Sequence, residues 1–160
     1  MLKQYENRDF KLLQSWVTDA ELLFQFAGTD FHYPITEQQL TVYKEKNPDR
    51  HFYIGYYDNQ AAAFGEIIPQ SDAAFRLGRL IVGNPNLRGQ GLGYRFDKDL
   101  VNECKETFHA KVVDLFVWEE NHPAIRCYQK AGFSFTDEPG FFLQYNDKQF
   151  TIHKMSLRVI

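Results

Sequence analysis

The sequence has little of several features that define whole classes of protein. It has 160 residues but only 2 cysteines, and Cys104 and Cys127 lie far apart with no paired Cys/His spacing. Neither a zinc site nor a redox motif is predicted, and a reducing, cytoplasmic setting is expected. No apolar run approaches the roughly 20 residues that span a bilayer, and the first residues lack a signal-peptide profile. We therefore expect an unprocessed cytoplasmic protein with no metal and no membrane partner.

The sequence also lacks a dominant charge. Its 18 Lys and Arg residues face 21 Asp and Glu, a net charge of −3, so no nucleic-acid partner is expected. Apolar residues make up 44% of the chain, and 15 Phe, 9 Tyr and 2 Trp supply bulky core material. No linker, low-complexity tract or repeat divides the sequence. A single domain over residues 1–160 is therefore predicted.

Hydrophobic patterns predict an α+β (mixed α/β) chain with the element order α-α-β-β-β-α-β-α-β-β. The first third is helical, with Asp19 as an N-cap, and Thr36 with Gln39 forms a capping-box signature for a helix ending at Asn47-Pro48. Later helices are predicted at Gln90–Phe108 and from Asn121 to Gly132. The predicted strands are His51–Tyr57, Ala61–Ile68, Ala73–Val82, Val112–Trp118, Phe133–Phe135 and Phe141–Leu157, the last with a turn at Asn146-Asp147.

The strongest local signal is the segment Arg88-Gly89-Gln90-Gly91-Leu92-Gly93 between a strand and an amphipathic helix. Its glycines leave backbone N–H groups uncovered, and the positive end of the helix dipole lies behind them, an arrangement that suits a pyrophosphate. The alternative is a glycine turn without a ligand. A Walker loop is excluded because no Gly-Lys-Ser/Thr follows, and a dinucleotide fingerprint is excluded because Tyr94 stands where it needs glycine.

Two segments in this order resemble motifs of the GNAT superfamily of acyl-CoA-dependent N-acyltransferases. Arg88, Gly91 and Gly93 match the core of motif A, and Asn121-x-x-Ala-Ile-x-x-Tyr128-x-x-x-Gly-Phe is similar to motif B. The resemblance is sharp over Leu80–Phe133. The segment 26–36 also looks like that of uncharacterised bacterial members. The resemblance implies a mostly antiparallel twisted sheet with helices on both faces and two splayed parallel strands, Ala73–Val82 and Val112–Trp118.

The same resemblance implies acetyl-CoA as co-substrate and assigns most of the site. Backbone groups of Leu80, Ile81 and Val82 would bind the pantetheine arm and polarise the thioester. The N–H groups from Arg88 to Tyr94, thus of Arg88, Gly89, Gln90, Gly91, Leu92, Gly93 and Tyr94, would hold the pyrophosphate. Tyr128 would protonate the departing thiolate, although an aromatic at helical spacing is also typical of core. Asn121 caps a helix in either case, and a hydrogen bond to the cofactor is a second expectation.

The general base is the least defined part of the predicted site. Relatives carry a Glu on the strand before motif A, whereas 78–82 contains no carboxylate. Glu66, inside the apolar strand 61–68, is the substitute that we expect. Burial of a carboxylate requires a function or a partner, so a structural ion pair with Arg76 or Arg79 is the alternative. His32 and Tyr33 are expected to line the acceptor pocket, and a merely solvated His32 is the competing interpretation.

The sequence therefore predicts an N-acetyltransferase that transfers an acetyl group from acetyl-CoA directly to a primary amine in a ternary complex. The alternatives are a non-catalytic acyl-CoA-binding or sensing module on the same fold, and an interaction scaffold without cofactor binding. The acceptor stays open among polyamines, amino acids, aminoglycosides, peptide N-termini and protein lysines. The net charge of −3 mildly favours cationic small molecules. A homodimer is suggested by the family alone.

Overall fold

The computed structural model describes residues 1–84, 87 and 89–159. Its internal contacts divide the chain into two compact units. The first unit contains Met1–Ile68 and Gly78–Leu92, and the second contains Pro69–Leu77 and the chain from Gly93 onward. Of the predicted loop, Arg88 lies outside the described residues.

The first unit is built on antiparallel strands that start at the N-terminus. Strand β1 (Leu2–Gln4) pairs with β2 (His51–Tyr57), and β2 pairs with β3 (Gln60–Pro69). A register shift between Gly55 and Tyr56 interrupts the second pairing. The β2–β3 hairpin was predicted from its apolar runs, whereas β1 was not, because three residues are too few to show an alternating pattern.

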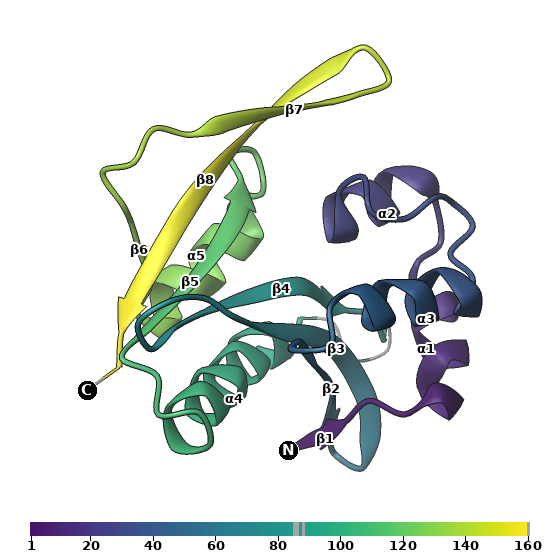
Figure 1. Cartoon of the computed structure of the whole chain (residues 1–160), viewed down its shortest axis with the longest axis horizontal. Coiled ribbons are helices and arrows are strands. Elements are labelled where there is room, and N and C mark those ends of the chain that lie inside the picture. The colour runs from purple at the N-terminus through teal and green to yellow at the C-terminus, as the bar shows by residue number, and fades with distance from the viewer. Residues whose placement is uncertain (85–86, 88, 160) are drawn as a thin grey trace. The chain divides into compact units, whose positions relative to one another are not determined.

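Helices precede β2 in the first unit (Figure 1). A 3₁₀ turn, η1 (Asn7–Asp9), leads into α1 (Phe10–Trp16), which is followed by α2 (Ala20–Ala27) and α3 (Glu37–Lys46). The predicted order has two helices here, whereas the structure has three. The chain breaks before Asp19, whose carboxylate accepts a hydrogen bond from the Leu22 N–H and so starts α2 as a separate helix.

Large side chains fill the core of the first unit. Leu13 of α1, Leu23 of α2 and Ile54 of β2 are almost completely buried, and the Tyr5 ring meets Phe64 edge-on at 5.6 Å. Trp16 packs so tightly on the chain after Val82 that a Cβ added to Gly83 would lie 2.1 Å from its ring. This position therefore requires glycine for space.

The second unit is a sheet around β8 (Lys148–Arg158). Strand β8 pairs antiparallel with β5 (Val112–Trp118), β7 (Phe141–Tyr145) and the short β6 (Ser134–Phe135). Strand β4 (Ala74–Val82) begins in this unit and ends in the first, and its residues Ala74–Leu77 run parallel to β5. The pairings described are antiparallel except for β4 with β5, which confirms the predicted α+β class.

The two remaining helices lie where the sequence predicted them: α4 (Leu92–Glu106) and α5 (His122–Ala131). Phe96 and Leu100 on the predicted apolar face of α4 are buried. Trp118, at the end of β5, stacks on Phe150 of β8 with the ring centroids 4.2 Å apart. None of the helices in the described ranges is long and apolar enough to cross a bilayer.

Candidate functional site

Glu66 on β3 is completely buried, and both of its carboxylate oxygens are held by neighbouring groups. The Tyr43 hydroxyl donates to Oε1 at 2.7 Å, and Arg50 Nη1 lies 3.4 Å from the same oxygen. Arg79 Nη1 donates to Oε2 at 3.0 Å. This arrangement includes the ion pair with Arg79 that the sequence offered as the alternative role of Glu66.

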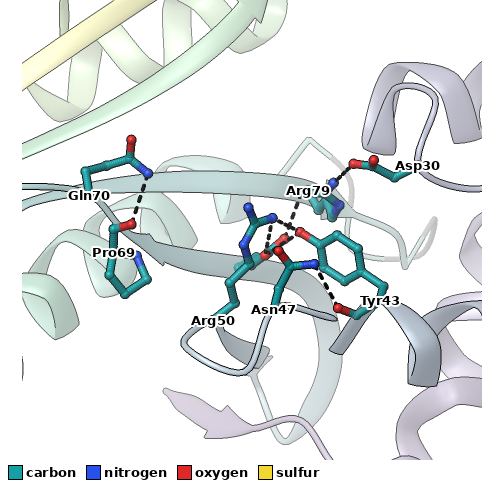
Figure 2. Close-up of polar contacts among 8 residues, drawn as sticks. Asp30, Tyr43, Asn47, Arg50, Pro69, Gln70 and Arg79 are labelled. Carbon is teal, nitrogen blue, oxygen red and sulfur yellow. Dashed lines mark hydrogen bonds and ion pairs between the residues drawn. The ribbon is translucent and has the colours of Figure 1, made fainter. Parts of the chain in front are cut away.

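Tyr43 and Arg50 point toward each other in Figure 2, and they are hydrogen bonded. Burial raises the pKa of the Tyr43 hydroxyl above its usual range, and the neighbouring Glu66 carboxylate raises it further. The phenol therefore keeps its proton at neutral pH and acts as a donor to Glu66. A buried carboxylate that accepts this bond and faces two guanidinium groups is well stabilised.

Arg79 connects this cluster to the strand that carries the predicted pantetheine contacts. Its guanidinium also pairs with Asp30, in the loop after α2 (Figure 2). Its backbone has a φ of 48°, a left-handed conformation that is unusual inside a strand. Arg79 is therefore paired with a carboxylate on each side, and its left-handed backbone lies within β4, immediately before Leu80.

Leu80, Ile81 and Val82 form the end of β4, as the sequence predicted. The chain then turns away: the Gly83 N–H donates to the Ala62 carbonyl at 2.9 Å. Ile81 is buried, whereas Leu80 and Val82 are partly exposed. Backbone groups at these positions directly follow the left-handed residue Arg79.

The glycine loop, residues 89–93 of the predicted pyrophosphate segment, has the backbone that an anion cradle requires. Gly89 and Gly91 have φ angles of 79° and 72°, which other residues rarely adopt, and a Cβ added to either would meet nothing within 4 Å. The glycines are thus required by conformation and leave open space beside the backbone. The helix α4 begins at Leu92, so the N–H groups of its first turn, including Gly93 and Tyr94, have no partners within the helix. The open space beside the glycines and the N–H groups at the start of α4 are the two features that a pyrophosphate site requires.

Helix α5 carries the remaining residues of the predicted site, and it lies in the second unit. Asn121 caps it as predicted, since its Oδ1 accepts from the Ala124 N–H at 3.3 Å. Tyr128 is half-buried and meets the Phe133 ring edge-on. Burial raises the pKa of its hydroxyl above 10, with further contributions from Asp97 and Cys127, so the phenol holds its proton at neutral pH. A protonated phenol is what a proton donor to a thiolate requires.

A cavity of about 420 Å³ opens in the first unit, between the loop after α2 and helix α3. His32 lines it, and the backbone of His32 is fixed by two hydrogen bonds with the Gln39 side chain. The hydroxyl of the exposed Tyr33 instead donates to the Thr18 carbonyl. Of the two predicted acceptor residues, the structure thus brings His32 to the cavity.

Sequence reasoning missed Tyr43, Arg50 and Asp30, which surround Glu66 and Arg79. The signal that could have found them is the buried carboxylate itself, because it needs more than one partner. Among the described residues, no cluster of His, Cys, Asp or Glu side chains could hold a metal ion.

Comparison with known proteins identifies the family of this chain. Residues 13–133, which include the glycine loop and α5, match the acetyltransferase (GNAT) family. The chain belongs to the GNAT family. Among GNAT relatives, the spermine/spermidine N(1)-acetyltransferase of Bacillus subtilis is 31% identical over 100 residues, and so is a probable spermine N(1)-acetyltransferase of B. subtilis subsp. natto. Each match covers 57% of this chain and 66% of the relative, slightly under two thirds of its length.

Solved GNAT structures share the fold over nearly the whole chain. The spermidine N-acetyltransferase of Vibrio cholerae, in complex with CoA and spermine, has a TM-score of 0.82 at 13% identity. An aminoglycoside acetyltransferase in complex with coenzyme A has a TM-score of 0.75 at 16% identity. Both alignments cover 99% of this chain and 94% of the other. The predicted GNAT fold is confirmed by these similarities.

Proposed function

We propose that this chain is an acetyl-CoA-dependent N-acetyltransferase whose acceptor is a small molecule with a primary amine. The observation that carries the proposal is the left-handed glycine loop at the start of α4 in a chain of the GNAT family. The relatives are named for polyamines, and a structural neighbour is named for aminoglycosides. The net charge of −3 also favours a cationic acceptor. Two free cysteines fit a reducing, cytoplasmic location.

In this proposal the loop and the end of β4 bind and orient the co-substrate. The N–H groups of Gly89, Gly91 and the first turn of α4 would hold its pyrophosphate, and Leu80–Val82 would hold the pantetheine arm. Acetyl-CoA supplies an activated acetyl group: the amine nitrogen bonds to the thioester carbon, the carbon–sulfur bond breaks, and the sulfur leaves as a thiolate. Tyr128 would give its proton to that sulfur.

The reaction also needs a group that removes a proton from the acceptor amine. A lysine-type amine has a pKa of about 10.4, so it must lose a proton before it attacks. Glu66 was the expected base, but both of its oxygens are already occupied by donors. We therefore propose that water removes this proton and that Glu66 positions Arg79 and the end of β4.

The proposal is tested with the purified chain, first by ligand-dependent thermal unfolding. Acetyl-CoA and CoA should raise the midpoint, whereas ATP and NAD should not, because only a ligand of the native state stabilises it. Thiol release is then measured with spermidine, an aminoglycoside and an amino acid as acceptors. Amine-dependent release is the expected result.

The matched variant is Tyr128→Phe, which removes one hydroxyl and keeps the ring. It should lower kcat by about 10²-fold or more and leave CoA affinity nearly unchanged. CoA binding without amine-dependent thiol release would instead support the sensing module. The absence of any shift with saturating acetyl-CoA would overturn the enzyme and the sensor alike.

A further inference from the structure

The cavity beside α3 has features that the acetyl transfer does not use. Its volume of about 420 Å³ is in the range of small-molecule sites, and it lies entirely within the first unit. It is lined by the loop after α2, by α3 and by the segment that leads into β2. Gln38, Lys46, Asn47 and Arg50 contribute side chains with hydrogen-bond donors to this lining.

The charge of the lining is positive. The lining residues include two cations, Lys46 and Arg50, and one carboxylate, Asp30. Arg50 is also paired with the buried Glu66, so Lys46 is the cation whose charge no carboxylate among the described residues offsets. The Asp30 carboxylate is already paired with Arg79, as Figure 2 shows. A negatively charged ligand is therefore favoured over a polyamine in this cavity.

Lys46 and Arg50 both carry N–H groups that can donate hydrogen bonds to a ligand. Within the described part of the chain, Lys46 makes no ion pair or hydrogen bond that fixes its ammonium group, and its side chain is exposed. Arg50 contacts Tyr43 and Glu66 through Nη1. No described residue is hydrogen bonded to its Nη2 or Nε, so both can donate to a ligand. A guanidinium binds carboxylate and phosphate oxygens in a forked geometry.

A plainer role for Lys46 is to oppose the negative end of the α3 dipole, as Lys44 also does in the last turn. The two lysines differ in their surroundings. The Lys44 ammonium lies 5.3 Å from the centroid of the Tyr5 ring and so covers the core. Lys46 instead faces the cavity. This difference makes Lys44 a control for Lys46 on the same helix turn.

We propose that the cavity is a binding site for a small organic anion, whose carboxylate or phosphate group lies between Lys46 and Arg50. Gln38 and Asn47 offer further amide donors to the same group. The site goes beyond the proposed acetyl transfer, since the glycine loop and α5 take no part in it. The proposal also assigns His32, which the sequence placed in an acceptor pocket, to the lining of an anion site instead.

The test is an NMR titration of ¹⁵N-labelled protein, alone and saturated with CoA. CoA saturation occupies the loop proposed for phosphate, so that a phosphate probe reports on the cavity. The probes are succinate, citrate and glycerol 3-phosphate, with spermidine as a probe of opposite charge. Amide resonances of residues 36–50 should shift with at least one anion. Comparison of the shifts caused by succinate and citrate with those caused by glycerol 3-phosphate shows whether the site binds a carboxylate or a phosphate group.

Lys46→Gln should weaken the bound anion at least about fivefold, because it removes a charge-assisted hydrogen bond. Lys44→Gln should change the affinity by less than twofold. Equal weakening by both variants, shifts with spermidine in place of the anions, or no shifts with any probe would overturn the proposal. CoA-induced shifts elsewhere are read in the same experiment, so a failure of the proposed acetyl transfer is distinguished from a failure of the anion site.

Discussion

At the scale of single residues, Glu66 is a strongly constrained side chain. It is fully buried, and its carboxylate faces Tyr43, Arg50 and Arg79. The removal of one partner from a buried pair costs more than the pair itself contributes, because an uncompensated charge stays behind. The side chain thus supports its neighbours more than it is available to a substrate.

Glu66→Gln should lower the free energy of unfolding by about 3 kcal/mol, because it leaves two guanidinium groups facing a neutral amide. Urea denaturation measures this change. The control is Glu138→Gln, which loses an exposed pair with Lys154 and should change stability by less than about 1 kcal/mol. If Glu66→Gln kept its stability and lost only turnover and the acidic limb of the pH–rate profile, Glu66 would be the base after all.

The sequence predicted that the Glu66 carboxylate would be buried and need a partner, but it did not identify all of the partners. A carboxylate in an apolar strand implies a cation, and Arg79, thirteen residues later, was among the candidates. Tyr43 comes from α3, which meets β3 only through tertiary packing, so no local pattern shows it. Arg50 directly precedes β2, and the hairpin register, in which Phe52 pairs with Glu66, brings it near this carboxylate.

At the scale of elements, caps and close contacts decide where the chain turns. Asn121 and Gly132 bound α5 as predicted, with Gly132 in the left-handed conformation at a φ of 109°. Such signals lie within a few residues of each other and can be found in a sequence. Gly83 is different, because it is required by a distant residue: the Trp16 ring of α1 occupies the space that a Cβ at this position would need.

Gly83→Ala should therefore destabilise the protein by about 2 kcal/mol or more, since the added methyl overlaps the Trp16 ring. The midpoint of thermal unfolding reports this loss. The double variant Gly83→Ala/Trp16→Leu should be less destabilised than the sum of the two single variants, because the smaller side chain leaves room for the methyl. Strict additivity would show that the contact is not what fixes this glycine.

At the scale of the whole molecule, burial changes the titration of tyrosines in both units. The pKa of Tyr5 and Tyr43 in the first unit and of Tyr128 in the second is raised, mainly by desolvation. The unfolded chain releases these protons near pH 10, before the folded chain does. Their contribution to stability is thus complete below pH 10 and is lost as the pH rises above it.

Absorbance at 295 nm should accordingly show fewer than the 9 tyrosines ionised at about pH 11 while the far-UV circular dichroism is native. The missing phenolates should appear together with loss of structure at higher pH. Titration of all tyrosines in one step near pH 10, with native dichroism, would contradict the burial of these three.

The fold class could be predicted because local hydrophobic patterns and motifs show the order of helices and strands along the sequence. The division into two units could not, because one of its boundaries falls inside β4, between Leu77 and Gly78, where the sequence is one continuous strand pattern. Contacts between distant segments make that boundary, and a local pattern does not record them.

The placement of the two tryptophans gives the molecule a separate fluorophore in each unit. Trp16 is buried in the first unit beside Gly83, and Trp118 stacks on Phe150 in the second. Each indole therefore emits from an environment that its own unit creates. Replacement of one tryptophan by phenylalanine leaves a single emitter, so the loss of structure in either unit can be followed optically without an attached dye.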